Sequence, residues 1–350
     1  MLRRLLGRSR RGGACVGALV LMALTLLLFA GASSEAAYAA QSRNEASEQI
    51  PGAALWRDVR QGVSGITNSP DAEHGNLINS SGEDWRQTRN GPVAAFGRWA
   101  LALAALGIGL LFLIRGRIRV DNGFSGKTIE RWTAPDRVIH WFVAILFVVL
   151  ALTGLSFLYG KELLLPIMDR ASFAAWGALA KTLHNYGGPL FVAGLVLMIV
   201  KWLPHNRFKK IDAVWLAKGG GILTKAHPSA EYLNAGEKLW FWLVVFGGLG
   251  VSISGLILDF PNFGQTRGTM QLTHILHTLF ALTLMAVFLG HVYIATLGTE
   301  GALEGMVYGH VDVEWAKQHH DLWYQEVVEG KGAAAEKIPD ISPSDKPATL

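Results

Sequence analysis

Apolar residues in this chain of 350 residues are gathered into long blocks, which are separated by shorter polar stretches. A transmembrane helix needs about 20 mostly apolar residues, and a soluble protein of this length would not contain several such blocks. The blocks predict five membrane-spanning helices: Val93–Ile114, Val138–Leu158, Leu183–Leu203, Leu239–Leu258 and Leu272–Leu297. The pattern therefore predicts an all-α polytopic membrane protein.

Residues 1–39 have the pattern of a secretory signal peptide. Several arginines precede an apolar run from Ala14 to Ala30, and Ala37-Tyr38-Ala39 forms a small-residue cleavage site. The apolar run is long, so an uncleaved anchor is the alternative. Residues 40–92 are polar, rich in Gly, Ser and Asn and without periodicity. We expect a loosely ordered periplasmic segment there.

Positive charge is concentrated after the first and third predicted spans. The residues concerned are Arg115, Arg117, Arg119, Lys201, Arg207, Lys209, Lys210, Lys218 and Lys225. Cytoplasmic loops carry an excess of Lys and Arg, whereas the loops Tyr159–Lys181 and Asp259–Gln271 have fewer cations and are expected in the periplasm. Residues 93–119 then form an extra transmembrane helix with a basic flank. The C-terminus, with a disordered tail over 332–350, is predicted to be cytoplasmic in a bacterial inner membrane.

Composition and cysteine content narrow the redox chemistry that this chain could carry. The chain is 51% hydrophobic and has a formal net charge of +5. Its single cysteine, Cys15, lies in the signal segment. The rest of the chain therefore has no internal disulfide, no Cys-x-x-Cys-His for covalent haem and no cysteine set for an iron–sulfur cluster. If electrons arrive from such clusters, another subunit must hold them.

The last predicted span carries three histidines, His274, His277 and His291. Imidazoles inside a membrane are costly and usually face a bundle interior or a functional site. His277 and His291 are 14 residues apart. At ~100° and ~1.5 Å per residue they return to the same helix face, ~40° short of four turns, and lie ~21 Å apart along the axis. One helix could thus supply an axial ligand to each of two stacked haems, or both histidines could be satisfied by hydroxyls or waters.

Two further histidines pair with these by depth. His140 is expected at the cytoplasmic end of its span, at the same depth as His291. His184 is expected at the periplasmic end of its span, at the same depth as His277. Two protein ligands leave a haem iron no open position, which suits electron transfer and not oxygen binding. The pattern predicts two bis-histidine haem b groups, with His140, His291, His184 and His277 as the metal ligands.

The other histidines and the nearby glycines leave alternatives open. His274 lies one turn from His277 and could be an alternative ligand or a contact of a propionate or water. We favour His277 because the 17 residues from His274 to His291 would leave those two about 100° apart. Glycines near these histidines could let a flat macrocycle approach the backbone closely, or could only allow helices to pack against each other. These glycines are Gly154, Gly187, Gly188, Gly194 and Gly290. Solvated surface is expected for His205, His227, His310, His319 and His320.

From about Val120 to Lys331 the sequence resembles the gamma subunit (cytochrome b subunit) of respiratory formate dehydrogenase. The matching stretches are Asp136–Trp141, Leu183-His184, Tyr232–Lys238, His277, Gly290–Tyr293 and Trp315–His320. The resemblance implies a four-helix dihaem cytochrome b domain over residues 120–331. It also implies that His140 and His291 hold the cytoplasmic haem, and that His184 and His277 hold the periplasmic haem.

The resemblance further implies a quinone site beside the cytoplasmic haem, where Asn234 and Gly236 could hydrogen-bond a quinone carbonyl. The same stretch has the pattern of a helix start, with Asn234 as cap and Glu237 as its capping-box partner. The implied partners are an iron–sulfur beta subunit and a molybdenum or tungsten alpha subunit that oxidises formate. This chain would then conduct electrons without oxidising formate itself. Residues 1–119 extend beyond the family's shorter form.

Two other functions remain open from the sequence. The cytochrome b subunit of a hydrogenase or thiosulfate reductase has a similar helical design and differs in the electron donor. A membrane transporter or anchor without haem could use the histidines as proton relays. That function needs acidic partners inside the spans, and Asp259 lies only at a span end. Membrane lipid and quinone are expected as partners, and nucleic acid is not.

Overall fold

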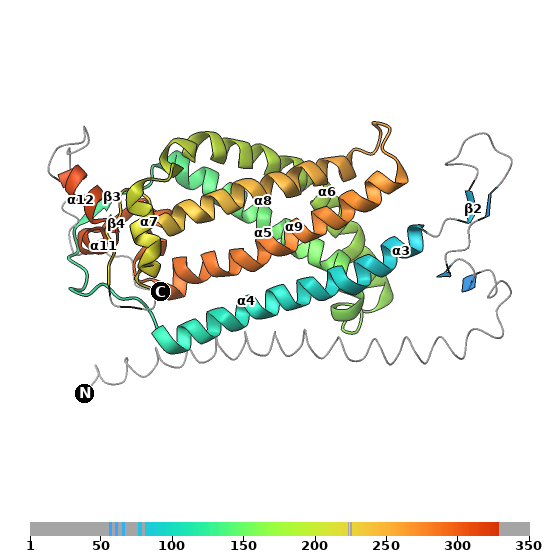
Figure 1. The fold of residues 1–350 in the computed structure, drawn as a ribbon, viewed down its shortest axis with the longest axis horizontal. Coiled ribbons are helices and arrows are strands. Elements are labelled where there is room, and N and C mark those ends of the chain that lie inside the picture. The colour runs from blue at the N-terminus through green and yellow to red at the C-terminus, as the bar shows by residue number, and fades with distance from the viewer. Residues whose placement is uncertain are drawn as a thin grey trace. The chain divides into compact units, whose positions relative to one another are not determined.

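The computed structural model describes residues 56–57, 60–61, 65–66, 76–78, 81–222, 224 and 226–328. The predicted signal peptide and the predicted disordered tail lie outside these residues. Five helical stretches in the described part are long and apolar enough to cross a membrane: Ser81–Arg115, Ala134–Leu163, Arg170–Asn206, Ala235–Asp259 and Arg267–Gly298. They confirm the prediction of an all-α polytopic membrane protein (Figure 1).

Long helices dominate the described part, and short elements connect them. The long helices are α4 (Ala94–Arg115), α5 (Ala134–Leu163), α6 (Arg170–Trp202), α8 (Ala235–Asp259) and α9 (Arg267–Tyr293). The short helices are α3 (Ser81–Thr88), α7 (Lys210–Ala217), α10 (Ala302–Tyr308), α11 (Val313–His319) and α12 (Asp321–Val328). Single turns are η1 (Arg89–Val93), η2 (Leu203–Asn206), η3 (Gly219–Gly221) and η4 (Ile294–Gly298). Strands β1 (Gly65–Ile66) and β2 (Asn76–Ile78) pair antiparallel, as do β3 (Thr128–Glu130) and β4 (His310–Asp312).

Two segments that were predicted as irregular are helical. Residues 81–92 form α3 and most of the π-helical turn η1, which leads directly into α4. Glu83 lies in the first turn of α3, where a carboxylate is favourable, and it pairs with Arg86 at 2.7 Å. The predicted periplasmic loop Tyr159–Lys181 is also mostly helical. Asp169 Oδ1 accepts hydrogen bonds from the backbone N–H groups of Ala171 and Ser172, both at 2.9 Å, and thereby starts α6 early.

The chain forms two compact units, each built from separate segments. Of the described residues, unit 1 comprises those up to 106, 151–185 and 253–283, and unit 2 comprises those within 107–150, 186–252 and 284–328. In unit 1, Ala94 at the start of α4 packs in one buried cluster with Tyr159 of α5 and Leu282 of α9. The buried Tyr159 hydroxyl donates to the Ala94 carbonyl at 2.7 Å, and Arg98 pairs with Glu162 at 3.0 Å. The extra helix therefore packs against helices of its own chain.

Gly97 makes the close approach of α4 possible. A Cβ atom there would contact the Tyr159 hydroxyl and lie 2.7 Å from Leu282 Cδ1. We expect Gly97→Ala to lower the free energy of unfolding by about 1–3 kcal/mol, because a buried methyl group without space forces its neighbours to shift. Thermal unfolding in detergent measures this effect. Gly107→Ala is the matched control on α4, since no heavy atom lies within 4 Å of its Cβ position; equal melting temperatures for the two variants would contradict the prediction.

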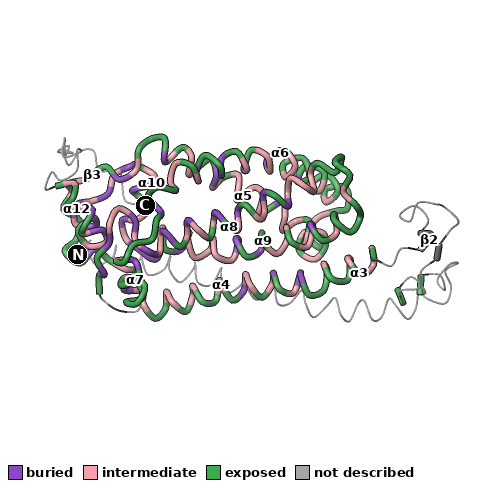
Figure 2. Tube along the Cα trace, turned by 45° about the horizontal axis from the view of Figure 1, so that its top comes forward, coloured by how far each residue is buried: buried purple, intermediate pink, exposed green. Residues whose placement is uncertain are grey.

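Unit 2 contains two buried clusters. In the first, Val143 of α5 packs with Leu195 of α6 and Val244 of α8. In the second, Ile129 of β3 packs with Trp315 of α11 and other apolar side chains of the C-terminal segment. Many large apolar side chains elsewhere are exposed, and those on α4 include Leu103, Leu106, Leu110 and Leu113. Exposed residues recur along the length of α4 (Figure 2). Exposed apolar helix faces of this kind suit contact with lipid.

Candidate functional site

The first histidine pair lies in unit 2. His140 is in the second turn of α5 and His291 is in the last turn of α9. Their ring centroids are 6.3 Å apart, with ring planes at 52°. The His291 ring stacks on the indole of Trp240 at 4.6 Å and 8°. His140 Nδ1 is buried and has no hydrogen-bond partner among the described residues. The structure thus brings together the two histidines that were predicted to pair at one depth.

The start of α5, which carries His140, is held by several polar contacts. The Asp136 carboxylate accepts hydrogen bonds from the backbone N–H of Thr133 at 3.1 Å and from Trp202 Nε1 at 2.8 Å. Lys201 lies 3.2 Å from the same carboxylate. Arg137 donates to the carbonyl of Val307 at 2.8 Å. These contacts fix the first turns of the helix and therefore the position of His140.

The second histidine pair lies in unit 1. His184 of α6 and His277 of α9 have ring centroids 6.2 Å apart, with ring planes at 74°. His184 Nδ1 lies 2.8 Å from Thr153 Oγ1 of α5. His277 Nδ1 lies 3.1 Å from Ser254 Oγ of α8. Each Nδ1 is therefore engaged by a hydroxyl from a neighbouring helix.

The sequence did not lead us to predict the Thr153 and Ser254 contacts with the histidines, although a short repeated pattern indicates them. Thr153-Gly154-Leu155 and Ser254-Gly255-Leu256 share the order hydroxyl, glycine, leucine. A Cβ at Gly154 would lie 3.5 Å from His184 Cε1, and one at Gly255 would lie 3.2 Å from His277 Cε1. In both places the hydroxyl orients a histidine ring, and the glycine leaves space for its edge.

The remaining small residues and His274 take different positions. A Cβ at Gly194 would lie 2.8 Å from the Phe142 ring, so this glycine serves helix packing. No heavy atom lies within 4 Å of a Cβ built at Gly188 or Gly290. His274 contacts Trp85 of α3, with ring centroids 5.2 Å apart.

Both histidine pairs fit a shared metal ion. A metal–imidazole nitrogen bond is about 2 Å long and a ring centre lies about 1 Å behind its ligating nitrogen, so two axial imidazoles on one iron have centroids about 6 Å apart. The observed centroid distances are 6.3 and 6.2 Å. Two imidazoles that bind one metal ion from opposite sides can be rotated relative to each other about the line that joins them. The interplanar angles of 52° and 74° are therefore compatible with this arrangement.

The loop before α8 has the geometry of a helix start. Asn234 Oδ1 accepts from the backbone N–H of Glu237 at 2.9 Å, and Glu237 Oε2 accepts from the backbone N–H of Asn234 at 2.9 Å. This capping box confirms the helix-start interpretation. A Cβ at Gly236 would lie 3.0 Å from the Trp215 ring, so close packing also requires a small residue there.

Arg131 connects this loop with the C-terminal segment. Its buried guanidinium donates to Glu237 at 2.8 Å and to the carbonyl of Tyr232 at 3.2 Å. It also lies 4.8 Å from the ring centre of Trp315 and 5.6 Å from that of Trp323. A desolvated cation over aromatic rings is stabilised by their quadrupoles. The C-terminal segment thus holds the loop from one side.

The prediction that His320 is solvated was wrong. Its side chain is 1% exposed, and its Nδ1 lies 2.7 Å from the carbonyl of Glu231. Burial lowers the pKa of His320 well below its usual value, and it lowers the pKa of the neighbouring His319 to about 4. Both rings are therefore neutral at pH 7 and serve packing. The packing of α11 and α12 buries His320 and half-buries His319, which hydropathy does not predict.

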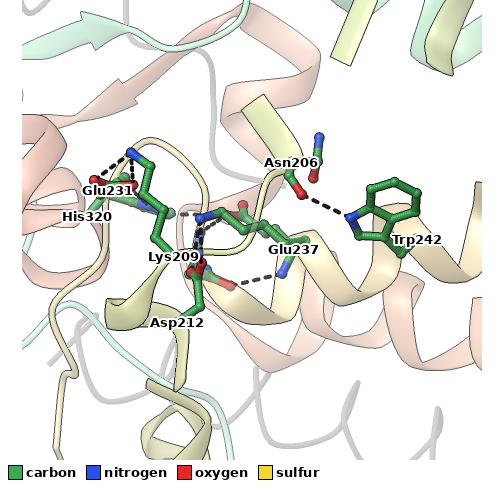
Figure 3. Close-up of polar contacts among 9 residues, drawn as sticks. Asn206, Lys209, Asp212, Glu231, Glu237, Trp242 and His320 are labelled. Carbon is green, nitrogen blue, oxygen red and sulfur yellow. Dashed lines mark hydrogen bonds and ion pairs between the residues drawn. The ribbon is translucent and has the colours of Figure 1, made fainter. Parts of the chain in front are cut away.

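A buried ion pair lies at the start of α8. Lys238 Nζ donates to both carboxylate oxygens of Asp212 at 3.0 and 2.8 Å. The two side chains are only 2% and 4% exposed. Asp212 also accepts from the backbone N–H of Lys209 at 2.7 Å and so caps α7. Figure 3 shows Asp212 and Glu237 within this network of polar contacts.

Five helical stretches in the described part that could cross a membrane, together with two facing histidine pairs, are the arrangement expected of a membrane cytochrome. The family model of prokaryotic cytochrome b561 matches residues 131–309, and the chain belongs to this family. The match includes all four paired histidines and the loop before α8. Family membership implies a b-type haem and makes the chain a multi-pass membrane electron-transfer protein.

Curated relatives agree with this assignment. The formate dehydrogenase cytochrome b556(fdo) subunit of Escherichia coli is 32% identical over 205 residues, which are 57% of this chain and 93% of that protein. The formate dehydrogenase cytochrome b556 subunit of Haemophilus influenzae is 28% identical over 61% of this chain and 89% of that protein. A hydrogenase II cytochrome subunit of Methanosarcina mazei is 25% identical over 49% of this chain and 79% of that protein. The predicted resemblance to formate dehydrogenase cytochrome b subunits is confirmed.

Proposed function

We propose that this chain is the dihaem b subunit of a formate dehydrogenase complex and conducts electrons across the inner membrane to quinone. The observation that carries the proposal is the presence of two facing histidine pairs, with ring centroids 6.3 and 6.2 Å apart. The similarity to relatives named as formate dehydrogenase cytochrome b subunits supports the choice of complex.

Each histidine pair would hold one haem b through its Nε2 atoms. Haem b, when bound, supplies reversible one-electron chemistry at its iron. The protein contributes the ring orientations. Stacking on Trp240 restricts rotation of His291, and the Thr153 and Ser254 hydroxyls engage the Nδ1 atoms of His184 and His277. Two fixed imidazoles exclude other ligands from the metal, as an electron-transfer centre requires.

Quinone would bind at the first turn of α8. The Asn234 side-chain oxygen already caps the helix, so its Nδ2 amide is the group that would donate to a quinone carbonyl. The first N–H groups of a helix lack intrahelical partners, and the backbone N–H of Gly236 is one of them. The contacts of Arg131 and the C-terminal segment would keep this loop in place. The two donors would thus be presented by a rigid element.

The proposed orientation follows from the distribution of charge. The basic segments near Arg115 and between α6 and α8 would face the cytoplasm. The His184–His277 pair would then lie on the periplasmic side and accept electrons from an iron–sulfur beta subunit, whose alpha subunit would oxidise formate. The His140–His291 pair would lie near the cytoplasmic quinone site. Reduction of quinone with cytoplasmic protons would build up a membrane potential.

Purification of the complex through an affinity tag on this chain tests the proposal. We expect iron–sulfur and molybdenum or tungsten subunits in the purified material by mass spectrometry. We also expect formate to reduce the b-type haem spectrum, and a quinone analogue to reoxidise it. The 25% identity to a hydrogenase cytochrome subunit keeps a hydrogenase partner as the second candidate; copurification of a hydrogenase and reduction by hydrogen alone would establish it instead.

A further inference from the structure

We propose that Thr153 and Ser254 are positioning residues that lower the reduction potential of the haem held by His184 and His277. This inference rests on the proposed function, because it assumes haem at that pair. Neither hydroxyl was predicted from the sequence. Both belong to helices that neighbour the helix of their histidine, with Thr153 on α5 facing α6 and Ser254 on α8 facing α9.

The Thr153–His184 and Ser254–His277 contacts are buried and short enough to hold each histidine ring in one orientation. Thr153 is 1% exposed and Ser254 is 7% exposed, and their oxygens lie 2.8 and 3.1 Å from the Nδ1 atoms. An imidazole that binds metal through Nε2 carries its proton on Nδ1 and must donate it. Each hydroxyl oxygen is therefore the acceptor, and each contact selects the tautomer that presents Nε2 to the iron.

The same contacts change the electronic character of the ligands. A hydrogen bond from Nδ1–H to an acceptor makes the imidazole a stronger donor to the metal. A stronger donor favours the ferric over the ferrous state and lowers the reduction potential. In the other pair, His140 Nδ1 has no partner among the described residues. His140 therefore lacks the contact that both histidines of the His184–His277 site have, and a lower potential at that site favours passing electrons onward.

Redox titration of the purified complex, followed by optical spectroscopy, tests the inference. In Thr153→Val and Ser254→Ala we expect two haems per chain and an upward shift of one midpoint potential, with the other unchanged. The double variant should show a larger shift, whereas Thr153→Ser and Ser254→Thr, which keep a hydroxyl, should stay close to the wild type. Ser252→Ala is the control on α8, because Ser252 Oγ makes no hydrogen bond within the described part of the chain.

The variants should also be combined with loss of one haem ligand. In a His140→Ala background, the haem at the His184–His277 site should remain, and Thr153→Val should shift its midpoint potential. In a His184→Ala background, the haem at the His140–His291 site should remain, and Thr153→Val should leave its midpoint potential unchanged. If Thr153→Val disturbs folding, the milder Ser254→Ala is measured in the same two backgrounds. Two haems at wild-type potentials in both hydroxyl variants, or a shift at the other haem, would overturn the inference. Absence of haem from the wild-type chain would instead overturn the proposed function.

Discussion

Replacement of His291 by alanine is expected to reduce the haem content from two haem b groups per chain to one and to abolish quinone reduction. The physical reason is that, in the proposed function, His291 and His140 would be the two side-chain ligands of one haem; their ring centroids lie 6.3 Å apart. The His184–His277 pair does not depend on either residue for its hydroxyl contacts. The remaining haem should therefore still be reduced by formate. Pyridine haemochrome assay and formate-dependent reduction measure the two effects.

His274→Ala provides the matched control for the loss of a histidine from α9. The His274 ring lies edge-on to Trp85 and is in neither of the two facing histidine pairs, so we expect this variant to keep both haems. His140→Ala should reproduce the phenotype of His291→Ala. Two haems per chain in the His291 variant, or loss of a haem from the His274 variant, would show that the ligands are assigned wrongly.

Lys238→Met is expected to lower the free energy of unfolding by about 3–5 kcal/mol, because it leaves a buried carboxylate without its cation. Asp212, its partner, is only 4% exposed, and the two oxygens of that carboxylate lie 3.0 and 2.8 Å from Lys238 Nζ. Denaturant titration in detergent measures the loss. Since α8 begins beside this pair, quinone reduction should also decline.

A second substitution separates the charge from the packing. Asp212→Asn in the Lys238→Met background removes the remaining charge and keeps an oxygen that can cap α7, so most of the stability should return. Lys209→Met is the exposed control, since its ammonium pairs with Glu231 while 58% of the side chain is exposed, and it should change stability little. A double variant as unstable as Lys238→Met would contradict the prediction.

The membrane-spanning helices and the histidine pairs could be predicted because both depend on short-range rules. Apolar block length predicts a span, and helical periodicity places His277 and His291 on one face. Depth then matches His140 and His184 to them. The resemblance to formate dehydrogenase cytochrome b subunits adds the loop with Asn234, whose alternative function as a helix cap the structure confirms.

The features that could not be predicted depend either on side-chain contacts between different helices or on local caps and ion pairs. Thr153 and His184 are 31 residues apart, and Ser254 and His277 are 23 residues apart. Burial of His320 results from the packing of short C-terminal helices. The helical start at Ser81 and the early start of α6 depend on local caps and ion pairs that hydropathy ignores.

The ratio of haem b to polypeptide in the purified wild-type complex tests the central claim most directly. Pyridine haemochrome absorbance gives the haem, and quantitative amino-acid analysis of the isolated chain gives the polypeptide. Two facing imidazole pairs predict a ratio of two, with both haems low-spin. A ratio of one or zero, or a high-spin haem with an open coordination position, would contradict the account.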